Sequence, residues 1–80
     1  MNNELEQKLK DIFSLVFKVD VEIISENSSI GDLPNWDSLN HMKLVAVIEE
    51  TFDINLTETD VSSMTSFELV YFTVESLLND

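Results

Sequence analysis

Ser38 is the residue of this chain whose type and setting most suggest a chemical role. It follows Asp37 and begins an apolar run in the stretch PNWDSLNHMKL, residues 34–44. His41 stands three residues further on, but a serine nucleophile also requires an oriented base and an oxyanion site. The G-x-S-x-G motif of hydrolases is absent as well. The pattern therefore predicts no catalytic serine, and the chain itself is not expected to be an enzyme.

Two other roles for Ser38 stay open at this point. A serine at the start of a helical run commonly caps the helix by accepting a hydrogen bond from a free backbone N–H group, and Ser66 has such a setting. Ser38 differs because it follows a loop that contains Pro34 and Trp36. A phosphate on its oxygen would lie near the positive end of a helix dipole, where anions are favoured. Ser38 is therefore interpreted as an acceptor that another enzyme modifies, with a helix cap as the alternative.

The sequence predicts no metal site. Asp53, Asn55 and Thr57 alternate as in a calcium-binding loop. Such a loop needs Gly at its sixth position and Glu at its twelfth, and this chain has Glu58 and Met64 there. With a single histidine and no cysteine, the chain also lacks a zinc ligand set.

The elements that must position Ser38 are expected to be helices. One glycine and one proline among 80 residues are too few for a β-sandwich or barrel. The 44% of apolar residues argues against a disordered chain. We therefore predict a single all-α domain over residues 1–80. Helices are predicted over residues 4–17, 38–52 and 66–78, with a short helical turn over residues 57–62.

The predicted core comes from apolar residues at helical spacing. In the first helix the buried stripe is Leu5, Leu9, Ile12, Phe13 and Val16. In the last helix it is Phe67, Val70, Tyr71, Val74, Leu77 and Leu78.

Residues 18–37 show no helical repeat, and no second strand is available to pair with them. We predict a long ordered loop, and connections of this length are often functional. Trp36 is interpreted as an anchor of the loop, and His41 as a surface or loop-packing residue. The other apolar residues expected to hold the loop to the core are Val21, Ile23, Ile24, Ile30 and Leu33.

The second helix is apolar on two sides, which predicts either complete burial or an interaction surface. With only three substantial helices, complete burial is difficult, so an exposed second side is favoured over one covered by the loop. The predicted core side is Leu44, Val45, Ile48 and Phe52. The predicted exposed stripe is Leu39, Met42 and Ala46, flanked by Lys43, Glu49 and Glu50.

The charge of the chain limits its partners. Sixteen acidic residues against four lysines give a net charge of −12, which repels nucleic acid and anionic membranes and favours basic protein surfaces. The N-terminus is too polar for a signal peptide, and no segment approaches the length of a transmembrane helix. A cytoplasmic monomer without membrane insertion is expected.

Several short landmarks occur in a characteristic order along essentially the whole chain. They are Asp37-Ser38-Leu39, Ile48-Glu49-Glu50-Thr51-Phe52, Asp53-Ile54-Asn55-Leu56 and Met64-Thr65-Ser66. Together with the length and acidity, this order resembles the acyl carrier protein family. The resemblance implies a four-helix bundle of three main helices and a short third one, with a long loop between the first two. It also implies that a phosphopantetheinyl transferase uses Mg²⁺ to attach 4′-phosphopantetheine from coenzyme A to Ser38.

The resemblance further implies how such a carrier is used. The thiol of the arm holds an acyl or aminoacyl group as a thioester and presents it to partner enzymes. Docking onto basic, apolar patches of these partners would involve Asp37, Leu39, Met42, Ala46, Glu49 and Glu50. An acyl chain would be accommodated by Leu44, Ile48, Leu56, Val61, Met64 and Val70.

Some residues depart from carriers of fatty acid biosynthesis. Trp36, Asn40 and Lys43 stand where those carriers commonly have other types, and Leu69 and Phe72 add apolar surface to the last helix. We therefore expect a carrier for a specialised lipid, polysaccharide-modification or other secondary biosynthetic pathway. The alternative is an acidic helical protein-interaction domain in which Ser38 is only a helix cap.

Overall fold

The computed structural model describes residues 3–79 and confirms the all-α prediction. Its helices are α1 (Asn3–Phe17), α2 (Ser38–Phe52), α3 (Glu58–Ser63) and α4 (Phe67–Leu78), with a 3-10 turn η1 (Val21–Ile23) in the long connection. Within this described range there is no β-strand, only an isolated antiparallel bridge.

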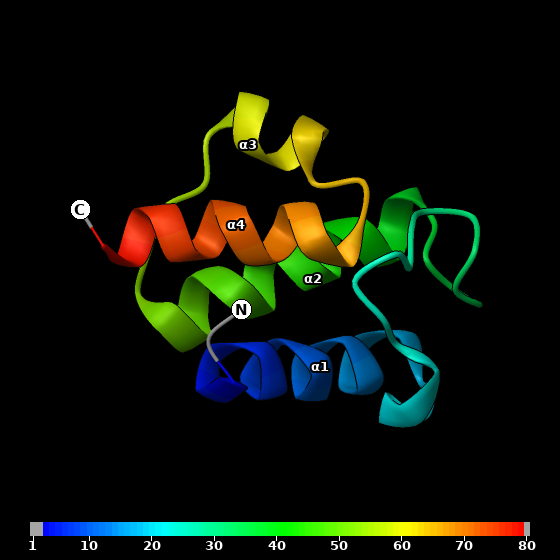
Figure 1. The fold of residues 1–80 in the computed structure, drawn as a ribbon. Helices are drawn as coiled ribbons and strands as arrows, with labels where there is room; N and C mark the ends of the chain where they lie inside the picture. Colours follow the sequence, from blue (N-terminus) through cyan, green and yellow to red (C-terminus); the bar gives the residue numbers. More distant parts are fainter. Residues whose placement is uncertain (1–2, 80) are drawn as a thin grey trace.

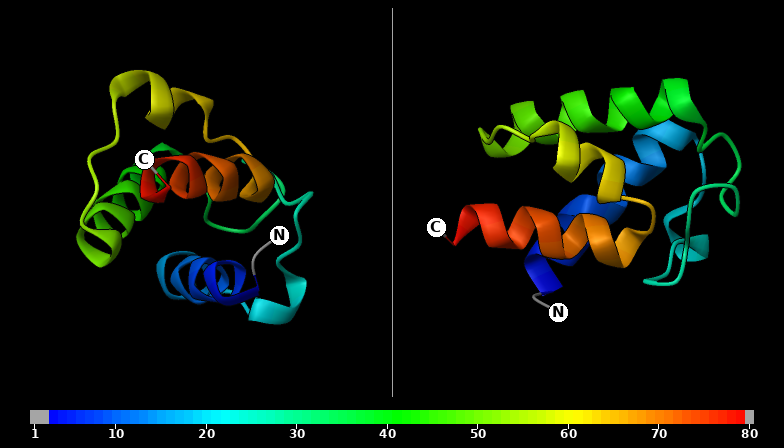
Figure 2. Two further views of the ribbon diagram at one scale, coloured as in Figure 1. Left: turned by 60° about the vertical axis from the view of Figure 1, so that its left-hand side comes forward. Right: turned by 90° about the horizontal axis from the view of Figure 1, so that it is seen from above.

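The helices form a bundle in which α3 lies on the outside (Figure 1). From above, α3 lies between α2 and α4, and α1 passes beneath them (Figure 2). The loop between α1 and α2 occupies one end of the bundle, and α2 begins at that end. Ser38 is therefore presented at the loop end of the molecule.

The core confirms most of the predicted helical stripes. Leu9, Ile12 and Phe13 of α1 are buried, and Leu5 and Val16 pack partly buried against them. Four residues of the α4 stripe have no exposed surface, namely Phe67, Val70, Tyr71 and Val74. Leu77 is half-buried, and Leu78 is exposed, contrary to prediction, because it lies in the final turn of α4 at the open end of the bundle.

Aromatic rings fill the centre of the loop end. Phe13 makes edge contacts with Phe17, Trp36 and Phe67 at centroid distances of 5.4, 5.2 and 5.0 Å. Trp36 also stacks on Phe17 at 5.3 Å. Trp36 is only 3% exposed, which confirms its predicted role as the anchor that packs the loop onto the bundle.

The loop is held less by side chains than we predicted. Ile24 and Leu33 are buried and Val21 is half-buried, but Ile23 and Ile30 are 53% and 43% exposed. The prediction was wrong for the last two because backbone hydrogen bonds to the start of α4 take over part of the anchoring. Their N–H···O distances are 2.9 Å from Ile30 to Thr65, 2.8 Å from Phe67 to Ser28 and 3.2 Å from Glu68 to Glu26.

Asp53 ends α2 in the left-handed region, with φ 55° and ψ 51°, and its N–H group donates to the carbonyl of Glu49. Glycine is the usual residue at such a helix end because a Cβ is disfavoured in this conformation. An aspartate there also places negative charge at the negative end of the helix dipole.

Asp53→Gly is therefore expected to stabilise the protein by about 0.5–1 kcal/mol through relief of backbone strain. Asp53→Asn keeps the shape and removes the charge, so it should stabilise by roughly 0.3–1 kcal/mol. Urea denaturation of the wild type and both variants measures these free energies. A glycine variant less stable than the wild type would show that the Asp53 side chain supports the helix end.

Candidate functional site

Asp37, not Ser38, is the N-cap of α2. Its carboxylate Oδ1 accepts a hydrogen bond of 2.9 Å from the backbone N–H of Asn40. Ser38 is the first residue of the helix itself, and it is exposed. Among the described residues, none forms a hydrogen bond with the Ser38 hydroxyl. The alternative interpretation of Ser38 as a cap is therefore wrong, because the adjacent aspartate fills that role one residue earlier.

Two asparagines hold the backbone that leads to Ser38 through hydrogen bonds from their side-chain amides. Asn35 adopts a left-handed conformation with φ 70°, which asparagine tolerates better than most residues. Its Nδ2 donates to the carbonyl of Phe17 at 2.8 Å, while its own carbonyl accepts from Asn40 Nδ2 at 2.8 Å. The start of α2 is thereby linked through Asn35 to the end of α1. Neither role was predicted from the sequence, and the tolerance of asparagine for positive φ is the one property that could have suggested the role of Asn35.

Trp36 and His41 form a second link at the same place. Trp36 Nε1–H donates to His41 Nδ1 at 3.0 Å, and the two rings stack with centroids 6.2 Å apart and planes 19° apart. The other ring nitrogen of His41, Nε2, lies 3.0 Å from the carbonyl oxygen of Val61 in α3. These contacts confirm His41 as a loop-packing residue.

The second apolar side of α2 is exposed, as we predicted. Leu39 and Met42 are 69% and 54% exposed, Ala46 is also exposed, and the loop does not cover them. On the opposite side Leu44, Val45 and Ile48 are buried and Phe52 is half-buried.

The acids around this stripe are not equivalent. Asp37 and Glu50 are exposed, although Asp37 is engaged as the helix cap. Glu49 is half-buried, and its Oε2 accepts a 2.8 Å hydrogen bond from the backbone N–H of Leu56. Glu49 therefore holds the segment after α2, which leaves Glu50 as the acid of this helix that is freer to meet a partner.

The six residues predicted to accommodate an acyl chain lie in the core or against it. Leu44, Ile48, Met64 and Val70 have no exposed surface, while Leu56 and Val61 pack partly buried against this core. Because the four side chains are fully enclosed, space for a chain between them would require their separation. Their role in accommodating cargo stays a prediction.

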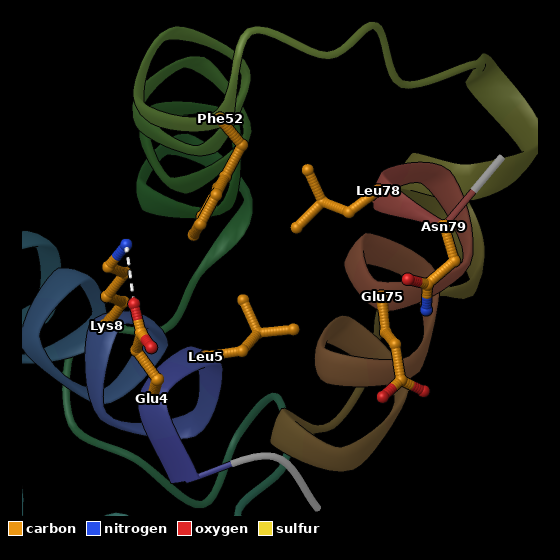
Figure 3. Close-up of a pocket in the computed structure, with 7 residues that line it drawn as sticks. All are labelled: Glu4, Leu5, Lys8, Phe52, Glu75, Leu78 and Asn79. Carbon is orange, nitrogen blue, oxygen red and sulfur yellow. Dashed lines mark ion pairs between the residues drawn. The ribbon is translucent and has the colours of Figure 1, made fainter.

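Two surface hollows lie elsewhere. One of about 380 Å³ lies between the N-terminal turn of α1 and the C-terminal ends of α2 and α4. Leu5, Phe52 and Leu78 point into it, and the exposed Glu4–Lys8 ion pair lies at its edge (Figure 3). The second, of about 310 Å³, is lined by Asp60 and by residues of α4 that include Leu69 and Phe72. Neither is lined by the six predicted cargo residues.

No three histidine, aspartate or glutamate side chains among residues 3–79 gather closely enough to hold a metal ion. None of the helices over the same range has the length and apolar character needed to cross a bilayer. The chemistry that the site offers is thus an exposed serine hydroxyl beside an exposed apolar stripe on a strongly acidic protein.

Comparison with known proteins identifies what this arrangement resembles. A family described as "Phosphopantetheine attachment site" matches residues 7–70, which include Ser38 and its supporting contacts. The chain is 35% identical to an acyl carrier protein of Buchnera aphidicola subsp. Schizaphis graminum over 66 residues, covering 82% of this chain and 84% of the relative. It is 30% identical to an acyl carrier protein of Syntrophobacter fumaroxidans over 67 residues, covering 84% and 83%. The polyketide-8 synthase acyl carrier protein 1 of Streptomyces avermitilis is 26% identical over 68 residues, with coverage of 85% and 81%.

The assignment of the helix cap predicts different costs for two neighbouring substitutions. Asp37→Ala should lower the free energy of unfolding by about 1 kcal/mol because it removes the cap. Ser38→Ala, at an exposed position without a hydrogen bond, should change it by less than about 0.5 kcal/mol. Urea denaturation of both variants measures the difference. Equal losses would contradict the assignment of the cap to Asp37 alone.

Proposed function

This chain belongs to the acyl carrier protein family, whose members are non-catalytic carriers with a covalent 4′-phosphopantetheine group, and we propose that Ser38 bears that group. The observation that carries the proposal is an exposed serine hydroxyl, free of hydrogen bonds within residues 3–79, in the first turn of α2. The cap at Asp37 leaves this hydroxyl available for modification.

The other serines of the chain support this choice by contrast. Several have side-chain oxygens engaged in local hydrogen bonds, namely Ser14, Ser28, Ser29, Ser63 and Ser66. Ser25, Ser62 and Ser76 are also exposed, but Ser25 lies in the loop outside any helix, and Ser62 and Ser76 lie towards the C-terminal ends of their helices. A phosphodiester is better placed at Ser38, because the start of a fifteen-residue helix offers a favourable dipole to its negative charge.

The residues around Ser38 are compatible with attachment of phosphopantetheine, but none of them can serve as the general base. His41 is three residues away, but both of its ring nitrogens contact other groups, Trp36 Nε1 and the Val61 carbonyl. The transferase must therefore supply the base that takes the Ser38 proton. The Ser38 oxygen then bonds to the pantetheine phosphorus of coenzyme A, and adenosine 3′,5′-bisphosphate leaves. Once bound, the arm supplies a thiol that holds an acyl or aminoacyl group as a thioester.

The stripe of Leu39, Met42 and Ala46 is proposed as the docking face for the transferase and for enzymes that load and use the cargo. It begins next to Ser38 and is exposed along α2. Asp37, Glu49 and Glu50 place negative charge around it, so basic, apolar patches are the complementary partner surfaces. Its exposure would equally serve an interaction domain without an arm, which is the second candidate function.

The pathway, the cargo and the oligomeric state of this carrier are also part of the proposal. We place the carrier in a specialised lipid, polysaccharide-modification or other secondary pathway, with acyl or aminoacyl cargo. Residues 1–80 are proposed to form one domain, since buried residues of α1, α2 and α4 share a core cluster. A cytoplasmic monomer fits the absence of cysteine and the net charge of −12, which opposes self-association.

Incubation with coenzyme A, Mg²⁺ and a broad-specificity phosphopantetheinyl transferase should add one phosphopantetheine to the wild type. Ser38→Ala should gain none, because the accepting oxygen is gone. Intact-mass spectrometry measures both, with an established carrier protein as the positive control for the transferase. A wild type that stays unmodified while the control is loaded would favour the interaction-domain function instead.

Met42→Glu is expected to raise the KM of the transferase for this carrier, because it replaces an apolar contact of the docking stripe with a carboxylate that is costly to bury against the apolar part of the partner patch. Its effect on stability should stay within about 0.5 kcal/mol, since the side chain is exposed. Steady-state kinetics and urea denaturation test the two statements together. A matched substitution at exposed Leu15 on α1, Leu15→Glu, should leave the KM unchanged. A large loss of stability in Met42→Glu would show that this side chain belongs to the core.

A further inference from the structure

The side chains of the segment from Asn35 to His41 fall into two groups, those that support the fold and those that are exposed and form no hydrogen bond. Five of its seven side chains form hydrogen bonds, and one of these five, Trp36, is also buried. Ser38 and Leu39 are the two exceptions: both are exposed, and neither side chain forms a hydrogen bond with the part of the chain that the structure describes. Hydrogen bonds thus hold the residues on both sides of Ser38, the proposed attachment residue, and Leu39, the first residue of the docking stripe.

Trp36 and His41 are the pair on which this arrangement depends most. Trp36 is 3% exposed, and its indole N–H can only donate a hydrogen bond. Its acceptor is His41 Nδ1 at 3.0 Å. Without that acceptor the N–H group would be left unsatisfied in a nearly water-free position, which is costly.

The partners of His41 assign its tautomer. Nδ1 must carry the lone pair because it accepts from Trp36, so Nε2 carries the proton and donates to the carbonyl of Val61 at 3.0 Å. The neutral ring therefore has both nitrogens in use. The His41 imidazole therefore connects Trp36, which lies two residues before Ser38, to helix α3.

We infer that Trp36 and His41 are positioning residues for arm transfer: their hydrogen bond holds the segment in the conformation that presents the Ser38 hydroxyl to the transferase. This inference rests on the proposed role of Ser38. The rings of Phe13 and Phe17 pack against Trp36, and His41 lies near the start of α2. A bond between them sets the direction in which the chain enters the helix, and Ser38 lies between the two residues.

A purely structural role would give the same packing, so the test must separate stability from positioning. Trp36→Phe leaves His41 Nδ1 without its donor, and His41→Phe leaves the indole N–H without its acceptor. The double variant keeps two aromatic rings and removes both polar partners, so it leaves neither of them unpaired. The Val61 carbonyl also accepts from the N–H of Met64 at 3.4 Å, and none of these substitutions removes that donor.

The experiment measures arm transfer to the wild type, the two single variants and the double variant, with the concentration of carrier varied. We expect the double variant to recover stability relative to the sum of the single variants, yet to lose about tenfold to about a hundredfold in kcat. The KM for the carrier should stay unchanged, since the stripe of Leu39, Met42 and Ala46 is intact. Val74→Ala, a core truncation in α4, serves as the control for lost stability alone and should retain the wild-type kcat while folded.

A second readout does not depend on the transferase. The backbone N–H of Asn40 donates to Asp37 Oδ1, and that of His41 donates to the Asp37 carbonyl at 2.8 Å. Amide hydrogen exchange at these two groups should be faster in the double variant and should rise there more than elsewhere in α2.

The outcomes distinguish this inference from the proposed function. If the wild type is loaded and the double variant has the wild-type kcat, or if Val74→Ala loses as much, the positioning role is overturned and the function stands. Unchanged amide exchange at Asn40 and His41 would overturn it as well. If the wild type is not loaded by a transferase that loads a control carrier, the proposed function fails, and the inference fails with it.

Discussion

The burial of Trp36 is the interaction on which the rest of this structure depends. Its ring packs against Phe13 and Phe17 of α1 and against His41 of α2. Buried Ile24 and Leu33 and the backbone hydrogen bonds to the start of α4 hold the earlier part of the twenty-residue connection. Trp36 fixes the last part, which leads directly into α2. Burial of one large aromatic ring and satisfaction of its single N–H group locate the loop end, and therefore the entry into α2.

At the start of α2, the residues that stabilise the fold are different from the residue proposed to carry the function. Asp37 caps the helix, and Asn35 and Asn40 close the preceding turn. Because these neighbours satisfy the backbone, the exposed Ser38 hydroxyl makes no hydrogen bond within residues 3–79 and can accept a large substituent at little cost. The same logic applies along the helix, where one side supplies the core and the other leaves an apolar stripe for partners.

Much of this was predictable because it follows from periodic patterns. Helical spacing predicted α2 at its observed bounds, the other helices to within about one residue, and the exposure of Leu39 and Met42. Exceptions have local causes. Asp37 and Ser38 are both good capping residues, and only the backbone geometry decides between them. Ile23 and Ile30 looked like anchors, but backbone hydrogen bonds, which no side-chain pattern encodes, hold the loop to α4. The Trp36–His41–Val61 connection joins three separate segments and has no signature in the sequence.

The most direct test of the central claim is to isolate the protein from its own cells and fragment it by tandem mass spectrometry. This locates any attached group on a particular residue without a chosen transferase. The account predicts phosphopantetheine on the peptide that contains Ser38, and fragment ions that assign it to Ser38 itself. Phosphopantetheine on another serine, or a Ser38 peptide that is always unmodified, would contradict it.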